Sequence, residues 1–349
     1  MKYLICQDWE NTANNHAGMK HLCNLLKDKF YNEYHVVVLK EIKSTTPTFF
    51  NRLKNKILFK IVIPLRNICV ALNIVWKLKD GDEVFLLEYM EKLSPQIYFA
   101  TIIKKCKPQV KIAGLVHLTP HALNDFFTDR EIKRWSAPLD TFITLGSSLS
   151  KYLVNKGISL SKIKTSYHYV DLDYYKKPEV QDVANWKANV IVMGNQRRNY
   201  EVLVKIIESN PEVSFTICKG MSNIDYLFSA LDNVKLVGFV KEDVLRKLMS
   251  EADISLNIMY DTVGSNVITT SMAMGLAIVT SDVGSIRDYC NENEAIFCNN
   301  EDVDSFSMAI AQLSQNRERL LKMKRAAILK AHNFKVEIFH DSLKFKKEE

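Results

Sequence analysis

The chain has 349 residues, of which 47% are hydrophobic and 25% charged, and its formal net charge is +7. This length exceeds what one hydrophobic core usually holds and suits two domains, and the composition excludes a disordered or low-complexity chain. The seven cysteines are scattered and never spaced as CxxC. They argue against a disulfide framework and a structural zinc site, so we expect a reducing, cytoplasmic compartment.

Short apolar runs alternate with amphipathic segments of helix length along the chain. Most runs are rich in Val, Ile and Leu without strict alternation, which is typical of strands buried on both faces of a parallel sheet. This alternation of strands and helices predicts doubly wound α/β sheets with right-handed crossovers. The predicted strands are 3–7, 34–40, 83–88, 111–117, 141–145, 163–170, 189–194, 214–219, 234–238, 253–258, 277–281 and 295–298. The predicted helices are 19–29, 94–105, 147–156, 200–208, 241–250, 303–314 and 317–332.

The alternation is interrupted by a polar run between residues 176 and 188. A polar run before a fresh strand is typical of a domain boundary, so we predict Rossmann-like domains at 1–178 and 179–333. Ligands of doubly wound folds bind at the carboxyl ends of the strands, and we expect the two domains to face one cleft there. The basic segment 334–349 is predicted to be a helix that packs back on the first domain.

The segment 49–79 combines positive charge with large apolar side chains. From residue 51 to residue 79 it has several Lys and Arg but no Asp or Glu, and Phe, Ile, Leu and Trp are interleaved. One interpretation is a cationic helix that lies on the surface of an anionic membrane. The other is a helix or helix pair of the first domain, broken near Pro64, with its lysines facing water. We expect no nucleic-acid partner, because no recognised binding module accompanies the charge.

The stretch 234–289 is the most informative part of the sequence. Within it, Gly264, Ser265 and Asn266 open a predicted helix, and their small side chains leave its first N–H groups uncovered. Such a helix terminus binds anions and suits a diphosphate. Gly275 is predicted to end the helix as its C-cap. The alternative is any βαβ unit with a glycine-capped helix.

The order of these features resembles the C-terminal signature of the retaining family 4 glycosyltransferases of GT-B fold. That signature reads "E-G-x-G-x-x-x-x-E-A-M-A-x-G-x-P-V-V" and follows a "V-x-L-x-G-x-V" strand, which is similar to residues 234–240 here. Residues 144–153, 162–175 and 295–313 resemble further segments of the family, so the similarity covers roughly 114–327. The resemblance implies a GT-B fold and a nucleoside diphosphate sugar as donor.

Site residues follow from this resemblance position by position. Arg197 and Arg198 stand in the family's "G-R-x-x-x-K-N" segment, whose cations hold the donor diphosphate, although an exposed basic turn would look the same. His117 resembles the histidine that touches the donor sugar, and His121 is the alternative. Gly18 matches the glycine loop after the first strand, where backbone approaches phosphate closely.

Two positions differ from the family. Thr262 and Thr270 stand where the family has paired glutamates. Asp261, adjacent to the first of these positions, is the candidate replacement there and with His117 forms the predicted catalytic pair. Thr270 is the candidate ribose partner, with Asp288 as the alternative. The chain is therefore expected to be a variant of the family.

The resulting hypothesis is a retaining hexosyltransferase that needs no metal and no resident cofactor. Its partners would be a nucleotide-sugar donor and a glycan or lipid-linked acceptor, in cell-surface polysaccharide biosynthesis at the inner face of the membrane. Catalysis would rest on stabilising the departing diphosphate. Two alternatives stay open: a non-catalytic GT-B-fold partner that binds glycan or another transferase, and a sugar-nucleotide epimerase or hydrolase.

Overall fold

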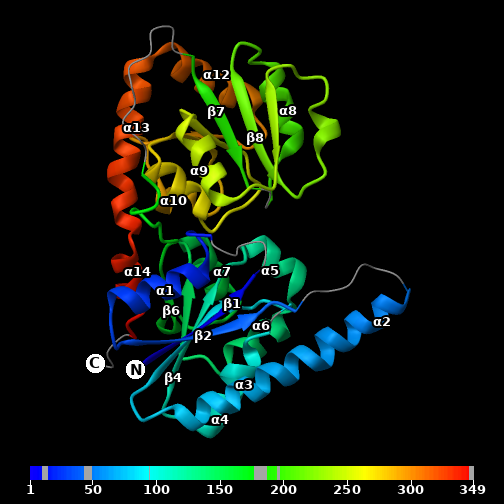
Figure 1. The fold of residues 1–349 in the computed structure, drawn as a ribbon, viewed down its shortest axis with the longest axis vertical. Coiled ribbons are helices and arrows are strands. Elements are labelled where there is room, and N and C mark those ends of the chain that lie inside the picture. The colour runs from blue at the N-terminus through cyan, green and yellow to red at the C-terminus, as the bar shows by residue number, and fades with distance from the viewer. Residues whose placement is uncertain (10–14, 43–48, 94, 177–186, 195–196, 346–349) are drawn as a thin grey trace. The chain divides into compact units, whose positions relative to one another are not determined.

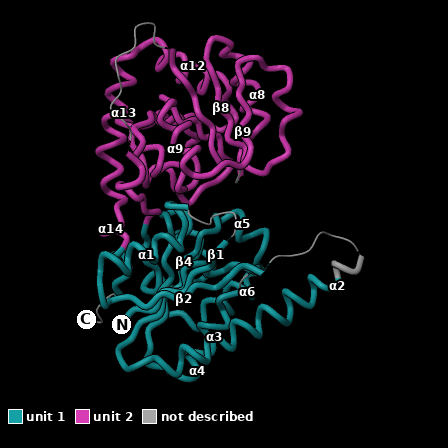
Figure 2. Tube along the Cα trace, in the orientation of Figure 1, with its two compact units in different colours: residues 1–166, 340–349 teal, residues 167–339 magenta. Residues whose placement is uncertain are grey.

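The computed structural model describes residues 1–9, 15–42, 49–93, 95–176, 187–194 and 197–345. The chain divides into two compact units: unit 1 comprises residues 1–166 and 340–349, and unit 2 comprises residues 167–339 (Figure 2). The predicted domain boundary at residues 178 and 179 lies outside the described residues. The chain passes from unit 1 to unit 2 before this predicted boundary, after residue 166. It returns to unit 1 after residue 339.

Unit 1 contains a six-stranded parallel sheet with strand order β2-β1-β3-β4-β5-β6 (Figure 1). Strand β1 lies between β2 and β3, and its Ile5, which is fully buried, lies opposite Val37 of β2 and Leu86 of β3. Sheet and crossovers match the predicted doubly wound class. The strands are β1 (Lys2–Asp8), β2 (Tyr34–Lys40), β3 (Glu83–Tyr89), β4 (Lys111–Val116), β5 (Thr141–Thr144) and β6 (Ile163–Thr165).

Two short helices of unit 1 were not predicted, and both begin at a threonine cap. Thr119 accepts a hydrogen bond from the Ala122 amide, and Thr128 forms a reciprocal capping box with Glu131. The helical segments are α1 (Met19–Lys29), α2 (Phe49–Ile57), η2 (Leu58–Val62), α3 (Ile63–Lys77), α4 (Ile97–Cys106), α5 (Pro120–Phe126), α6 (Asp129–Ser136), α7 (Ser147–Asn155) and η3 (Leu160–Lys162).

The expected break near Pro64 is wrong, because α2, η2 and α3 follow one another without a loop (Figure 1). Proline lacks the N–H that an α-helix needs four residues after a carbonyl. The chain accommodates this with a π-helical turn over Leu58–Val62, after which the Ile63 amide bonds to the Leu58 carbonyl. Pro64 then occupies the first turn of α3, where its missing N–H costs nothing.

Unit 2 contains a second six-stranded parallel sheet, with strand order β12-β11-β10-β7-β8-β9. Both faces of the central strand β7 are buried: Val190 and Val192 pack into one hydrophobic cluster, and Ile191 and Met193 into another. The strands are β7 (Asn189–Met193), β8 (Ser214–Gly220), β9 (Val234–Gly238), β10 (Ile254–Asn257), β11 (Ala277–Ser281) and β12 (Ala295–Cys298). The helical segments are α8 (Tyr200–Glu208), η4 (Asp225–Leu227), α9 (Glu242–Ser250), α10 (Asn266–Ala273), α11 (Ile286–Tyr289), α12 (Val303–Gln315), α13 (Arg317–Ala331) and η5 (His332–Phe334).

The last helix, α14 (Val336–Ser342), carries the chain from unit 2 back to unit 1. In unit 1 the ring of His340 stacks on Phe30, with ring centroids 3.7 Å apart, and its Nδ1 lies 2.6 Å from the Tyr34 hydroxyl. Lys164 of β6 donates to the Lys344 carbonyl at 2.7 Å. Stacking and hydrogen bonds therefore tie the end of the chain to the first and last strands of this sheet.

Candidate functional site

In unit 2, a cationic side chain meets the start of a helix at the carboxyl end of β7. Arg198 folds back over this strand end, and its Nη2 donates to the Met193 carbonyl at 2.6 Å. A Cβ atom at Gly194 (φ +77°) would lie 3.1 Å from Arg198 Nη2 and 3.3 Å from Val267 Cγ2 of α10. The glycine therefore leaves room for the guanidinium beside the first turn of α10.

The environment of Arg198 favours an anionic ligand. Burial lowers the pKa of the guanidinium to about 10, so it stays charged at neutral pH. Its hydrogen bonds go to a carbonyl and to Asn257, and its Nε is buried without a hydrogen-bond partner among the described residues. A buried cation without a paired carboxylate is costly unless an anion joins it, and a phosphate has the geometry for a guanidinium.

A chain of buried polar groups fixes Arg198 relative to α10. Arg198 Nη1 donates to Asn257 Oδ1 at 3.3 Å, and Asn257 Nδ2 donates to Ser255 Oγ at 3.0 Å. Ser271 of α10 donates to the same Ser255 hydroxyl at 2.9 Å. Asn257, Ser255 and Ser271 are fully buried. Each of these buried polar groups needs its hydrogen-bond partner because no water can replace it. This polar relay therefore holds the guanidinium and α10 in one arrangement.

The start of α10 is shaped by Gly264 and Tyr289. Ser265 is the N-cap and accepts from the Ile268 amide, so α10 begins where the sequence predicts. Gly264 has φ +90°, and a Cβ there would lie 2.0 Å from Tyr289 Cε2. The Tyr289 hydroxyl accepts from the His168 amide at 2.9 Å. At the other end the C-cap is Met274, one residue before the predicted Gly275, and Gly275 follows it with φ +65°, the left-handed conformation common directly after a C-cap.

Thr262 and Thr270 are both engaged in hydrogen bonds to the backbone. Thr262 Oγ1 accepts from the Gly264 amide at 3.0 Å, and Thr270 Oγ1 donates to the Asn266 carbonyl at 2.6 Å. Both side chains are buried. These bonds give Thr262 and Thr270 a structural part in the loop and the helix, and the ribose contact of Thr270 stays a prediction.

Asp261 and Arg197 lie in neighbouring loops of unit 2. Asp261 is half-buried, and a Cβ at Gly284 would lie 2.8 Å from its Oδ1. Arg197 has φ +51°, and its carbonyl accepts from the Tyr260 amide at 2.9 Å. The loop after β7 is thus held against the loop after β10. Asp261 and the two arginines therefore come from loops at the same, carboxyl edge of this sheet.

In unit 1, His117 directly follows β4. Its Nε2 lies 2.8 Å from the Leu87 carbonyl, and burial lowers its pKa, so the imidazole is neutral with the proton on Nε2 and the acceptor lone pair on Nδ1. The alternative, His121, is an exposed residue of α5. Gly18 is the N-cap residue of α1, with φ −80°, which any residue adopts. Its predicted phosphate contact would therefore depend on close approach and not on backbone conformation.

The same edge of unit 1 holds a buried acid that the sequence analysis did not single out. Glu88 of β3 accepts from the Gln7 amide at 3.0 Å, and its Oε1 has no hydrogen-bond partner among the described residues. Burial raises its pKa to about 8, so it carries a proton at neutral pH. The signal was present, because Glu88 is the one acid inside the apolar run that forms the body of β3.

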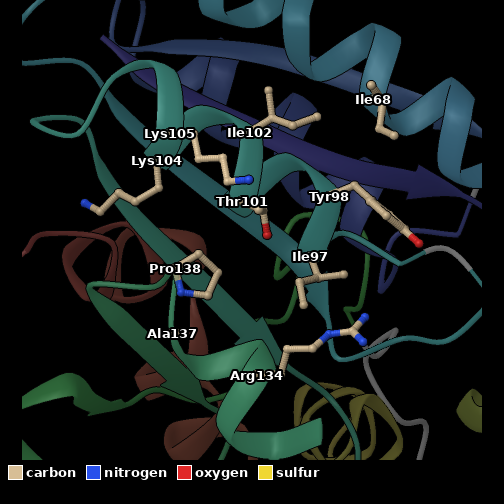
Figure 3. A pocket seen from close by; sticks show the side chains of 10 residues that line it. All are labelled: Ile68, Ile97, Tyr98, Thr101, Ile102, Lys104, Lys105, Arg134, Ala137 and Pro138. Carbon is tan, nitrogen blue, oxygen red and sulfur yellow. The ribbon is translucent and has the colours of Figure 1, made fainter.

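Unit 1 also contains a pocket of about 590 Å³ away from these strand ends (Figure 3). Its walls come from α3, from α4 and from the segment around α6. The lining is mostly aliphatic, with cationic groups beside it. The lining residues are Ile68, Ile97, Tyr98, Thr101, Ile102, Lys104, Lys105, Arg134, Ala137 and Pro138.

Comparisons with known proteins bear on this site. Residues 178–316, which include Arg198 and all of α10, match the model of the family described as glycosyl transferases group 1. No curated protein sequence matches the chain.

Solved structures match over almost the whole chain. Anabaena Alr3699/HepE in complex with UDP has a TM-score of 0.70 at 12% identity, and the match covers 98% of each chain. Sucrose-phosphate synthase from Thermosynechococcus elongatus has a TM-score of 0.74 at 13% identity, with 98% of each chain covered. The lipopolysaccharide outer core galactosyltransferase WaaB has a TM-score of 0.68 at 13% identity, covering 98% of this chain and 99% of that chain. These matches show a GT-B fold with two Rossmann-like domains, and with the family model they support a glycosyltransferase.

Proposed function

We propose that this chain transfers a sugar from a nucleoside diphosphate sugar to a hydroxyl group of a glycan or lipid-linked acceptor in cell-surface polysaccharide biosynthesis. The observation that carries the proposal is the meeting of the Arg198 guanidinium and the first turn of α10 over Gly194. A fixed cation and uncovered N–H groups stabilise the charge that develops on a departing diphosphate. The donor is a substrate, and the scheme assigns no step to a metal or a resident cofactor.

We propose uridine diphosphate as the nucleotide part of the donor. One structural neighbour, HepE, is described in complex with UDP and another of its structures with UDP-glucose. Arg198 and the helix terminus would hold the diphosphate, with Arg197 beside them. His117 and Asp261 would contact the transferred hexose, and the anomeric configuration would be retained. We place the reaction in the cytoplasm, where such donors are made.

Nucleotide binding is tested by thermal shift with UDP, GDP, CMP and dTDP. A ligand that binds only the folded state raises its stability with the logarithm of ligand concentration over Kd. We expect UDP to raise the Tm of the wild type but not of Arg198→Met. The matched control is Arg246→Met, because Arg246 also donates to a backbone carbonyl of unit 2, that of Tyr174 at 2.9 Å. If no nucleotide raises the Tm at millimolar concentration, the proposal is wrong and the non-catalytic alternative is favoured.

Product analysis then separates the enzymatic alternatives. The wild type is incubated with the donor that binds, with and without a mixture of glycan and lipid-linked acceptors. A sugar attached to an acceptor supports the transferase. A free sugar or an epimerised nucleotide sugar, formed equally without acceptor, indicates the hydrolase or epimerase instead.

A further inference from the structure

A row of apolar side chains runs exposed along the long helix of unit 1. Its members lie four or seven residues apart, which places them on one side of a helix. They are large and aliphatic or aromatic, and Trp76 at the end of the row is 89% exposed. The exposed row consists of Leu53, Ile57, Ile61, Leu65, Leu72 and Trp76.

The opposite side of α3 is fixed to unit 1. Ile63, Ala71 and Ile74 are buried, and α3 packs along α4. Asn67 is also buried, and its Nδ2 donates to the Pro95 carbonyl at 3.3 Å. The stretch Leu53–Lys77 is long and apolar enough to cross a bilayer by length and composition. Crossing would strip this buried side from α4, so in this fold the helix can only lie along a surface.

The charge of this helix indicates which kind of surface it contacts. Lys54, Lys56 and Lys60 are exposed on the helix that carries the row, and the structure records no ion pair for them among the described residues. No Asp or Glu occurs between residues 51 and 79. An apolar row accompanied by unneutralised lysines complements an anionic lipid surface, which offers hydrocarbon below a layer of phosphate groups.

The pocket lined in part by α3 brings further cations, which come from α4 and α6. Figure 3 shows Ile68 of α3, Ile97 and Ile102 of α4, and Arg134 of α6 around it. Lys104 is paired with Asp140 at 2.7 Å, whereas Lys105 and Arg134 are exposed and no ion pair is recorded for them in the described part of the chain. An aliphatic hollow with two available cations suits an amphiphile with a phosphate headgroup.

We infer that this face of unit 1 docks on an anionic phospholipid bilayer. The apolar row enters the headgroup layer, the lysines of α2 and η2 lie against lipid phosphates, and the pocket receives the headgroup of one anionic lipid between Lys105 and Arg134. The inference goes beyond the proposed function and stands independently of it, because none of these residues belongs to the candidate donor site.

The test measures binding of the full chain to vesicles by co-sedimentation and by tryptophan fluorescence. Vesicles of phosphatidylcholine alone are compared with vesicles that contain an equal share of phosphatidylglycerol. We expect binding to the anionic vesicles, weaker at high salt, and a blue shift of emission that is absent in Trp76→Phe. Emission should also be quenched by lipids brominated near the headgroup and not by lipids brominated at the chain end.

Matched variants separate the two parts of the surface. Ile61→Ser with Leu65→Ser should lower partitioning about tenfold or more. The control is Met308→Ser with Leu329→Ser, two exposed apolar residues of unit 2. Arg134→Glu should lower binding to anionic vesicles about fivefold or more, whereas Lys133→Glu, the same charge change at the next residue of α6, should have a smaller effect. All of the substituted side chains are exposed, so we expect unchanged Tm values.

Three results would overturn the inference. The first is no binding to anionic vesicles at low salt, and the second is equal binding to neutral and anionic vesicles. The third is a concentration-dependent dimer, detected by light scattering, that Ile61→Ser with Leu65→Ser abolishes, because the row would then be a protein interface. Nucleotide thermal shifts are measured without lipid, so failure of the vesicle test leaves the donor-binding result intact.

Discussion

The ring of Tyr289 occupies the space in which a side chain at Gly264 would have to lie. A Cβ atom at Gly264 would be 2.0 Å from Tyr289 Cε2, and the backbone there has φ +90°. Glycine is thus required twice, once by conformation and once by close approach, at the residue that leads into α10. The free energy of each requirement can be measured separately.

We expect Gly264→Ala to destabilise unit 2 more than backbone conformation alone explains. The control is Gly157→Ala in unit 1, where φ is +86° and a Cβ would meet nothing within 4 Å. The control should cost about 1 kcal/mol for its conformation, and Gly264→Ala about 1–3 kcal/mol more for overpacking. Urea unfolding measures both variants. Equal losses would show that Tyr289 moves aside without cost.

The polar relay behind Arg198 is expected to matter for both stability and nucleotide binding. Asn257→Ala removes the partner of Arg198 Nη1 and leaves Ser255 with one fewer hydrogen bond. The expected cost is about 1–3 kcal/mol of stability, with a several-fold weaker affinity for UDP because Arg198 loses a fixed position. Calorimetric titration with UDP checks the second effect. Asn233→Ala is the control, since Asn233 also donates two hydrogen bonds in unit 2, to the Asn210 and Val213 carbonyls. An unchanged affinity in Asn257→Ala would contradict the positioning role.

Glu88 is expected to make stability fall as pH rises. Its pKa is about 8 in the folded chain and near 4.5 when unfolded, so between these values the folded chain keeps a proton that the unfolded chain has released. The contribution of Glu88 to the free energy of unfolding is therefore most favourable below pH 4.5. It is lost as pH rises towards 8, by at most about 1.4 kcal/mol per pH unit. Glu88→Gln should flatten this slope in urea titrations between pH 5 and pH 8. A slope unchanged by the substitution would rule out the protonated carboxyl.

A buried ion pair at the amino end of β10 offers a further test of stability. Lys324 of α13 contacts Asp253, and both side chains are largely buried. Lys324→Met should cost about 3–5 kcal/mol, because it removes a cation that neutralises a buried carboxylate. Lys324→Met with Asp253→Asn should recover most of that loss. Thermal unfolding of the three proteins gives the comparison, and a loss in the double variant as large as in the single one would show that packing dominates.

The sequence predicted most of the framework and less of its detail. Every strand of both sheets was predicted to within a few residues, except that β6 ends at Thr165, since an uninterrupted apolar run in a parallel sheet reads clearly. The helices α5 and α6 were missed because they are short, with only 7 and 8 residues. Their caps, including the pattern from Thr128 to Glu131, were nonetheless visible in the sequence.

In the candidate site, local features could be predicted from the sequence, but contacts between distant segments could not. The helix start at Ser265 and the left-handed glycine directly after the C-cap, Gly275, follow from local rules. The approach of Arg198 to Val267 does not, because it joins segments about seventy residues apart and depends on Gly194 having no side chain. The close approach of the Tyr289 ring to Gly264 could not be predicted either, because it also joins separate segments. Such contacts are properties of the packed sheet and not of any one segment.

The route of the chain has a consequence for the order in which the protein is assembled during synthesis. Residues 167–339 are inserted into unit 1, so the segment that supplies His340 to Phe30 and Tyr34 leaves the ribosome only after all of unit 2 has been translated. Unit 2 is a continuous stretch and has all of its residues available earlier. The nascent first unit therefore stays incomplete, with its place for His340 exposed, until residues 340 and beyond have been translated. A chain cut short after residue 339 would have one complete unit and one left open to chaperones and proteases.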